Sequence, residues 1–248
     1  MKKNKHQIQF ISFLIATSVL SSASVVSAQE SAYADLDACT KGEQIKLTAK
    51  GAVTGALVGL GAAFLSGKKD DAAKAAVLGA AVGGAAGFAT AYYNAIGTCY
   101  KLNPTWIPES NIVRDPNKSY MQVKKENNYK PKEEGIKVLA KKMDMATSVT
   151  AGAKLDINST FDVMTPDGAE TAIVVERKLF AVEADKETAV FFPGRPSDQR
   201  TMEPGRNNDI VKLQIPMDAK VGSVYRVEFS VAAEGKVPTV ISKTVTVG

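Results

Sequence analysis

The sequence contains a single histidine, His6, and only two cysteines, Cys39 and Cys99, among its 248 residues. His6 lies in an N-terminal segment that we expect to be removed, so the mature chain would have no histidine. Without one, it can build neither a Ser-His-Asp nor a Cys-His pair, and it lacks the commonest protein ligand of transition metals. No spacing of carboxylates, or of Ser and Lys, suggests another catalytic arrangement. The sequence therefore predicts a protein that is not an enzyme, with no catalytic residue, no metal site and no cofactor.

A strong charge of one sign is also missing. The formal net charge of the whole chain is +5, with 31 basic and 26 acidic residues. Without Lys2, Lys3 and Lys5 the balance is 28 basic to 26 acidic residues, a net charge of +2. A nucleic-acid-binding domain usually carries a strong basic patch, so we expect no nucleic-acid partner.

Residues 1–28 have the composition of a secretory signal peptide. Three lysines precede an apolar stretch from Ile8 to about Val26, and Val26-Ser27-Ala28 offers small residues for cleavage. Ala32-Tyr33-Ala34 is an alternative cleavage site, and an uncleaved anchor helix is the alternative to cleavage. Cys39 lies too far beyond the apolar stretch for a lipobox. We therefore expect an exported protein of a bacterial envelope, in the periplasm or at the outer membrane or cell surface.

Small residues recur at every fourth position in two series. The first is Gly51, Gly55, Gly59 and Ala63; the second is Ala75, Gly79, Gly83 and Gly87. On a helix, this spacing places them on one face, where a second backbone can approach closely. Because glycine costs roughly 1 kcal/mol per helix position relative to alanine, such a pattern is favourable only where close packing offsets that cost.

An antiparallel helical hairpin centred on Lys69 brings the two series into register. Gly51 then faces Gly87, each later pair follows in step, and Cys39 faces Cys99. Two cysteines in an exported protein predict one disulfide, with two free thiols as the alternative. We therefore predict a disulfide-closed hairpin over residues 35–100.

The uncharged parts of the two hairpin arms, residues 51–67 and 75–99, would span roughly 25 and 37 Å at 1.5 Å per residue. These lengths bracket a hydrocarbon core of about 30 Å. Tyr92, Tyr93, Tyr100 and Trp106 lie near lysines, as in an interfacial belt. We expect the hairpin to associate with a membrane or with copies of itself as a homo-oligomer. The alternative is a hairpin that packs in water within its own domain or a multimer.

The paired G-x-x-x-G-x-x-x-G series around a short polar turn resemble the glycine-zipper two-helix segments of bacterial envelope proteins, among them small outer-membrane surface antigens. The resemblance covers residues 45–98. It implies an envelope location and helix packing or oligomer formation, and it implies no molecular activity. Many such proteins are lipoproteins, whereas this chain lacks a lipobox.

The second half of the chain has a different pattern. Residues 101–144 are rich in lysine and proline and predict a basic, extended linker with a short helix near Ile136–Lys142, either solvated or in contact with anionic lipid. Residues 145–248 alternate apolar and polar side chains, and about seven strands fit an immunoglobulin-like sandwich. Tyr225 is either a tyrosine corner or a plain core residue. The predicted fold class is thus α+β and multidomain: hairpin, linker and all-β sandwich.

The segment from Pro193 to Asn208 carries Arg195, Arg200 and Arg206 and predicts either a binding loop or an ordinary long hairpin loop. The leading hypothesis is a non-catalytic envelope protein whose sandwich binds another envelope protein. Two alternatives stand beside it. One is a secreted protein that permeabilises or forms pores in a target membrane, and the other is a soluble periplasmic interaction module.

Overall fold

The computed structural model describes residues 35–54, 84–109, 111–184 and 186–248, and the side chains of residues 48–54 and 84 lie outside the description. Tyr33–Gly248 form one compact unit. The predicted signal peptide and the small-residue series from Gly55 to Gly83 lie outside the described residues, so both remain predictions.

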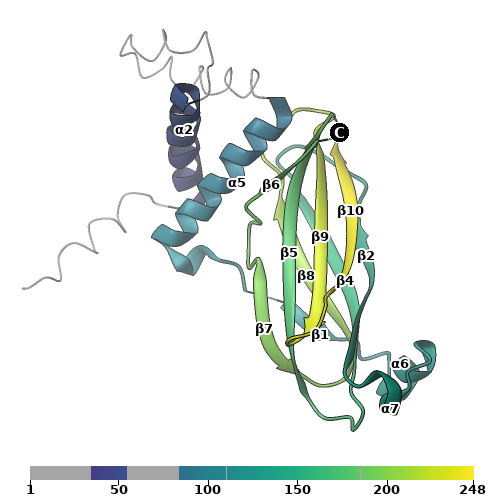
Figure 1. The fold of residues 1–248 in the computed structure, drawn as a ribbon. Coiled ribbons are helices and arrows are strands. Elements are labelled where there is room, and N and C mark those ends of the chain that lie inside the picture. The colour runs from purple at the N-terminus through teal and green to yellow at the C-terminus, as the bar shows by residue number, and fades with distance from the viewer. Residues whose placement is uncertain (1–34, 55–83, 110, 185) are drawn as a thin grey trace, which may run out of the picture. The chain divides into compact units, whose positions relative to one another are not determined.

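The strands form two sheets (Figure 1). The first is antiparallel, in the order β1 (Asn111–Arg114), β8 (Gly205–Gln214), β4 (Lys154–Met164) and β2 (Lys137–Met145). The second has the order β3 (Ser148–Val149), β10 (Thr239–Val247), β9 (Val224–Ala233), β5 (Thr171–Glu183) and β6 (Lys186–Val190). A further strand, β7 (Ser197–Met202), shares with β6 the edge of β5 that faces away from β9. The chain therefore has a mixed α+β fold with two β-sheets.

The inward-facing residues of both sheets meet in one apolar core. In β5, every second residue is buried, as Ile173, Val175 and Leu179 show. Phe161 of the first sheet and Phe229 of the second have their ring centroids 5.8 Å apart, so the sheets are in direct contact. The alternation of apolar and polar residues in the sequence therefore matches the alternation of buried and more exposed side chains. The reason is that successive side chains of a strand point to opposite faces.

Two helices, α2 (Leu36–Thr54) and α5 (Gly84–Leu102), are joined by the predicted disulfide between Cys39 and Cys99, whose Cα atoms lie 6.0 Å apart. This prediction is confirmed. The structure differs from the predicted separate hairpin domain, because α5 buries one stripe of its surface, Ala89, Tyr93, Ile96 and Tyr100, in the core shared with the strands. Among the described residues, no helix is both long and apolar enough to cross a membrane.

The aromatic residues expected at a membrane interface belong to this packing instead. Tyr93 is fully buried, and its ring lies edge-on to that of Tyr225, with the centroids 5.9 Å apart. Tyr100 contacts Phe191 in the same way. Spacing by three and four residues suits a helix that packs on a sheet as well as one that meets lipid, so the sequence pattern alone did not separate the two environments.

The close approach at α5 occurs at a glycine outside the predicted series. A Cβ atom built at Gly97 would lie 2.9 Å from ring atoms of Phe191. At Gly87, which is exposed, no atom of the described residues lies within 4 Å of the same position. The described part of the structure therefore shows no tight packing at Gly87, and its pairing with Gly51 stays a prediction.

A matched pair of substitutions tests this difference. Gly97→Val should destabilise the protein by about 1–3 kcal/mol, because the added side chain must displace α5 or the Phe191 ring. Gly87→Val should stay within about 0.5 kcal/mol of wild type, since no atom of the described residues lies within 4 Å of its Cβ position and valine is no worse than glycine in a helix. Urea unfolding measures both, and equal effects at the two positions would contradict the packing described for Gly97.

The predicted linker is wrong for most of its length. Residues 101–144 contain η1 (Pro104–Trp106), β1, α6 (Tyr120–Glu126), α7 (Pro131–Glu134) and most of β2. The short helix expected near Ile136–Lys142 is part of β2, whose inward residues Val138 and Met143 are buried. The many lysines of these elements lie on the outward face. Because of them, the alternation of inward-facing apolar residues was not recognised in the sequence.

Candidate functional site: a cavity beside the helix pair

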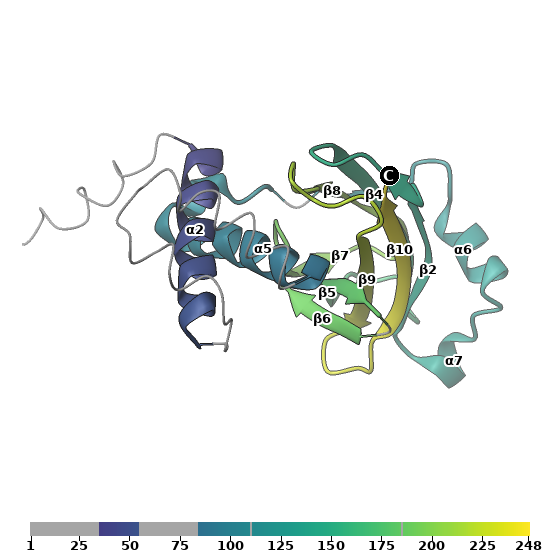
Figure 2. The same ribbon diagram turned by 90° about the horizontal axis from the view of Figure 1, so that it is seen from above.

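A cavity of about 600 Å³ lies between the helix pair and the strands. The two helices stand on one side of the sheets (Figure 2). The other walls come from β8, from the segment that precedes β1, and from the segment between β6 and β7. Its volume falls within the range of small-ligand sites, about 300–1,000 Å³, so this cavity is the candidate functional site.

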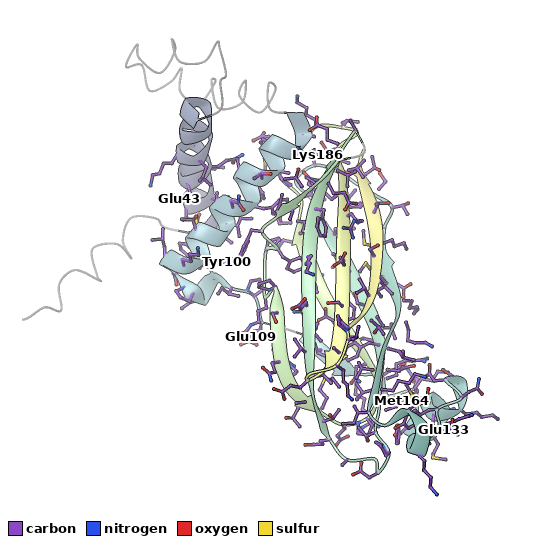
Figure 3. The ribbon with its side chains drawn as sticks, in the orientation of Figure 1. Glu43, Tyr100, Glu109, Glu133, Met164 and Lys186 are labelled. Atoms are coloured by element: carbon purple, nitrogen blue, oxygen red, sulfur yellow. A yellow bond between two sulfur atoms is a disulfide. The ribbon has the colours of Figure 1, made fainter. Side chains whose placement is uncertain are left out.

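The helix wall is mainly apolar and aromatic. Leu36 of α2 and Tyr92, Ile96 and Tyr100 of α5 line it. The disulfide joins α2 to α5 at this level, because Thr40 and Tyr100, which follow the two cysteines in sequence, are lining residues. Figure 3 labels two of the lining residues, Tyr100 on α5 and Glu109 in the segment after η1. The covalent link thus fixes the wall that α2 contributes.

A buried ion pair joins the two sheets at the strand side of the cavity. Arg177 of β5 donates two hydrogen bonds to Asp209 of β8, from Nε to Oδ2 at 2.7 Å and from Nη2 to Oδ1 at 2.6 Å. The side chains are only 4% and 1% exposed. Such a two-point contact is the geometry in which an arginine and a carboxylate bind most specifically. It holds β5 and β8 at a fixed separation where both line the cavity.

The segment between β6 and β7 is fastened to the same arginine. The backbone N–H of Arg177 donates to the carbonyl of Pro196 at 2.7 Å, and its Nη1 donates to the carbonyl of Arg195 at 2.9 Å. Both bonds satisfy polar groups at the point where β6 ends and β7 has not begun. The gap between β6 and β7 along the edge of β5 is therefore held in place by hydrogen bonds, and it borders the cavity.

Charges of both signs surround the opening. Besides the Arg177–Asp209 pair, the basic lining residues are Lys154, Lys212 and Arg195, and the acidic ones are Asp37 and Glu109. Lys212 pairs with Asp156 at 2.5 Å, and both side chains are well exposed. In the described ranges, no group of three or more His, Cys, Asp or Glu side chains is placed to hold a metal ion. The cavity is suited to bind a molecule of low net charge that has an apolar part.

The three arginines of the predicted loop separate in the structure, because the segment from Pro193 to Asn208 contains β7 and the start of β8. Arg195 lies at the cavity. Arg200 pairs with Asp198 within β7 at 2.7 Å. Arg206 in β8 pairs with Asp162 and Glu126 and does not line the cavity. The long-loop prediction is therefore wrong, and only Arg195 keeps a place at the candidate site.

Arg206 belongs to a clamp that holds α6 to the first sheet. Its Nε donates to Asp162 of β4 at 2.8 Å, and its Nη2 donates to Glu126 of α6 at 2.9 Å. Asp162, fully buried, also accepts from Asn127 at 2.8 Å. The pKa of Glu126 is lowered, mainly by its hydrogen bond from Lys118 and also by Arg206. Every member has a partner, so the cluster is structural.

Sequence reasoning missed Arg177 and Asp209, although a signal was present. Arg177 stands between Val175 and Leu179 at the inward positions of an alternating strand. An arginine at such a position must find a buried acidic partner or leave the core. The identity of Asp209 as that partner depends on the pairing of the two sheets, which the sequence pattern did not reveal.

Tyr225 is a core residue and no tyrosine corner. Its hydroxyl is buried and has no hydrogen-bond partner among the described residues. Tyr93, whose ring it contacts, donates its own hydroxyl to the carbonyl of Gln214 at 3.1 Å. Burial raises the pKa of Tyr225 to about 12 and raises the pKa of Tyr93 well above its usual value of 10.0.

The buried tyrosines make the fold sensitive to alkali. Burial also raises the pKa of Tyr92 and of Tyr100 to about 12. Because the neutral form is favoured in the folded state, this contribution to stability is complete below pH 10 and is lost as the pH rises from 10 towards about 12. We expect tyrosinate absorbance to rise in two steps, the second together with the loss of far-UV circular dichroism. Ionisation of all seven tyrosines in one step near pH 10, with the fold intact, would contradict this.

Comparisons with known proteins identify no family. No protein-family model matches the sequence, and no curated protein matches it.

Some solved structures resemble 46% of this chain. One is the sporulation control protein Spo0M from Bacillus subtilis, which is 12% identical over 49% of its own chain, with a TM-score of 0.30. They also include a β-glucosidase from Listeria innocua, with 15% identity, 16% of that chain and a TM-score of 0.34. A CARDB domain from Pyrococcus furiosus, in complex with two metal ions, shares 11% identity over 90% of its length, with a TM-score of 0.32. The similar region thus spans less than two thirds of the first two proteins, and at these TM-scores the likenesses carry no functional argument.

Proposed function

We propose that this protein is a non-catalytic interaction protein of the bacterial cell envelope, and that its immunoglobulin-like sandwich binds a partner in the cavity beside the disulfide-linked helices. The observation that carries the proposal is the cavity itself. It combines an apolar helix wall with an ion pair that fixes the position of the strands. Preformed sites that combine apolar walls with a few fixed polar groups are typical of ligand binding.

Export is supported by the disulfide, because structural disulfides persist in oxidising compartments and are rare in the bacterial cytosol. The Cys39–Cys99 bridge also has a structural role, since it links α2, which lines the cavity, to α5. Together with the signal-like residues 1–28, the bridge favours the envelope over the cytoplasm.

The proposal also includes association with a membrane or with other copies of the protein, and it assigns this association to a smaller part of the chain. α5 uses its Tyr93–Tyr100 face in the core, so this face is not available to lipid while the domain is folded. We therefore assign any association with a membrane or with other copies to residues 55–83, where most of the small-residue series lies.

Binding in the cavity is tested with a matched pair of substitutions and the apolar dye ANS. Val211 lines the cavity, whereas Val240 lies on β10 and is exposed. Val211→Trp should abolish dye binding by filling the cavity, and Val240→Trp should leave it unchanged. Dye binding that survives in Val211→Trp would exclude the cavity as the site.

Fractionation of the producing cells tests the location. We expect the mature protein in the membrane fraction, resistant to alkaline carbonate. Release into the medium together with leakage of dye from liposomes would instead support a membrane-permeabilising protein. Recovery as a soluble periplasmic monomer would support an interaction module without membrane contact, and a cytoplasmic protein with free thiols would contradict the proposal.

A further inference from the structure

One edge of β8 lacks a strand partner where it borders the cavity. On one side, β4 pairs with β8 along its whole length, from Gly205 to Gln214. On the other side, β1 pairs only with Asn207–Ile210. Among the described residues, the last part of β8, from Val211 to Gln214, therefore has no neighbouring strand on that side. Val211, Lys212 and Gln214 are all lining residues of the cavity.

The hydrogen-bonding groups of Lys212 point towards this open side. In an antiparallel sheet, alternate residues direct their backbone N–H and C=O groups to opposite neighbours. The carbonyl of Arg206 accepts from Asp115 on the β1 side at 2.9 Å, and the carbonyl of Gln214 accepts from Tyr93 at 3.1 Å. Lys212 has the same parity as these two residues. Among the described residues, no backbone hydrogen bond links Lys212 to the segment that precedes β1.

The space beside Lys212 has the form of a missing strand. Pro108 and Glu109, which precede β1, line the cavity and are not part of the strand that pairs with β8. The apolar wall of Ile96 and Tyr100 closes the cavity on the helix side. An extended chain placed here would meet the backbone N–H and carbonyl of Lys212, which have no partner on this side among the described residues, and an apolar surface beside them.

We propose that the cavity binds an extended peptide segment of a partner protein, which adds to the edge of β8 as a short strand. This inference rests on the proposed function and names its ligand class. The peptide residue opposite Lys212 would exchange two backbone hydrogen bonds with it, as in other cases of strand addition. Paired residues share a face of the sheet, so this residue would point outward, as Lys212 does, and its two neighbours would point inward with Val211.

The charges around the cavity favour a peptide of low net charge. Lys154 and Arg195 line the cavity together with the acidic Asp37 and Glu109, while Lys212 is paired with Asp156 and Arg177 with Asp209. The remaining charged lining residues are balanced between basic and acidic, so neither positive nor negative charge is in excess. The ligand is therefore recognised by its backbone and by apolar side chains at alternate positions.

A neutral model peptide tests the proposal directly. The probe is the heptapeptide acetyl-Thr-Val-Thr-Val-Thr-Val-Thr-amide, whose valines would face inward when a threonine pairs with Lys212. Added to the wild-type protein, it should displace ANS and slow the amide hydrogen exchange of Lys212. Methylation of the threonine amide nitrogens should weaken binding about tenfold or more, because it removes hydrogen bonds to β8. Methylation of the valine nitrogens, which point away from β8, should have little effect.

Two variants of the protein provide the matching test. Lys212→Pro removes the edge N–H and leaves the pairing with β4 intact, since proline is tolerated on edge strands. It should bind the peptide up to about tenfold more weakly, which corresponds to the loss of one hydrogen bond. Lys212→Ala keeps the backbone N–H, so it should bind the peptide more tightly than the proline variant does, and this comparison isolates the contribution of the N–H. If the proline variant does not fold, the methylated peptides still decide the question on the wild-type protein.

The outcomes separate this inference from the function on which it rests. Equal binding of the two methylated peptides, or no peptide binding at millimolar concentration by a protein that binds ANS in the cavity, would overturn strand addition alone. A protein that binds neither peptide nor dye would overturn the cavity as a site altogether. Slowed exchange at Lys212, with the expected order of the methylated peptides, would support the inference.

Discussion

Replacement of Arg177 by leucine should destabilise the protein by about 3–5 kcal/mol, because it leaves the Asp209 carboxylate buried without its partner. Asp209 is 1% exposed and accepts two hydrogen bonds from this guanidinium. The substitution also removes the bond from Nη1 to the carbonyl of Arg195. Urea unfolding of the purified protein measures the loss, which should appear as a lower midpoint with an unchanged denaturant dependence.

The double variant Arg177→Leu, Asp209→Leu is the control that separates charge from shape. A buried ion pair replaced by apolar residues of similar volume is often neutral in stability, so the double variant should recover most of the loss. An effect of Arg177→Leu below about 1 kcal/mol would mean that the pair behaves as a solvent-exposed one, and the cavity would then lack its fixed strand side. A double variant as unstable as the single one would assign the loss to packing.

The sequence predicted those parts of the fold that depend on local pattern. The alternation of apolar and polar residues over residues 145–248 predicted strands, and the structure has strands there, among them β5 and β10. The disulfide also followed from two cysteines in a chain with a signal-like N-terminus, and the shared register of the small-residue series supported it. These inferences need only the geometry of one strand, or the number of available partners.

The sequence was misleading where one pattern fits two environments. The stripe of Ala89, Tyr93, Ile96 and Tyr100 has the spacing of any amphipathic helix, and only the presence of a sheet edge next to it decides between core and lipid. The lysines of residues 101–144 had the composition of a linker, although Val138 and Met143 face the core. The cavity could not be predicted at all, because its walls come from α2, α5, β8 and two connecting segments that are distant in the chain.

Replacement of Tyr93 by alanine should also destabilise the protein by about 3–5 kcal/mol, the usual loss when a large aromatic side chain is removed from a core. Tyr93 is fully buried, contacts the rings of Tyr92 and Tyr225, and donates its hydroxyl to the carbonyl of Gln214. The loss should appear in the cooperative unfolding of the β-domain, since α5 and the strands share one core. If α5 were instead a membrane helix, unfolding of the β-domain in water would not change.

The control is Tyr93→Phe, which keeps the ring and removes only the hydroxyl. One hydrogen bond contributes about 0.5–1.5 kcal/mol, so this variant should lose far less stability than the alanine variant. The two should also differ at the cavity, because Tyr93 holds in place the helix that carries Tyr92, Ile96 and Tyr100. We expect ANS binding to persist in Tyr93→Phe and to fall in Tyr93→Ala at temperatures where both proteins remain folded. Equal dye binding in the two variants would mean that the helix wall keeps its position without this anchor, held by its other core residues, Ala89, Ile96 and Tyr100, and by the disulfide to α2.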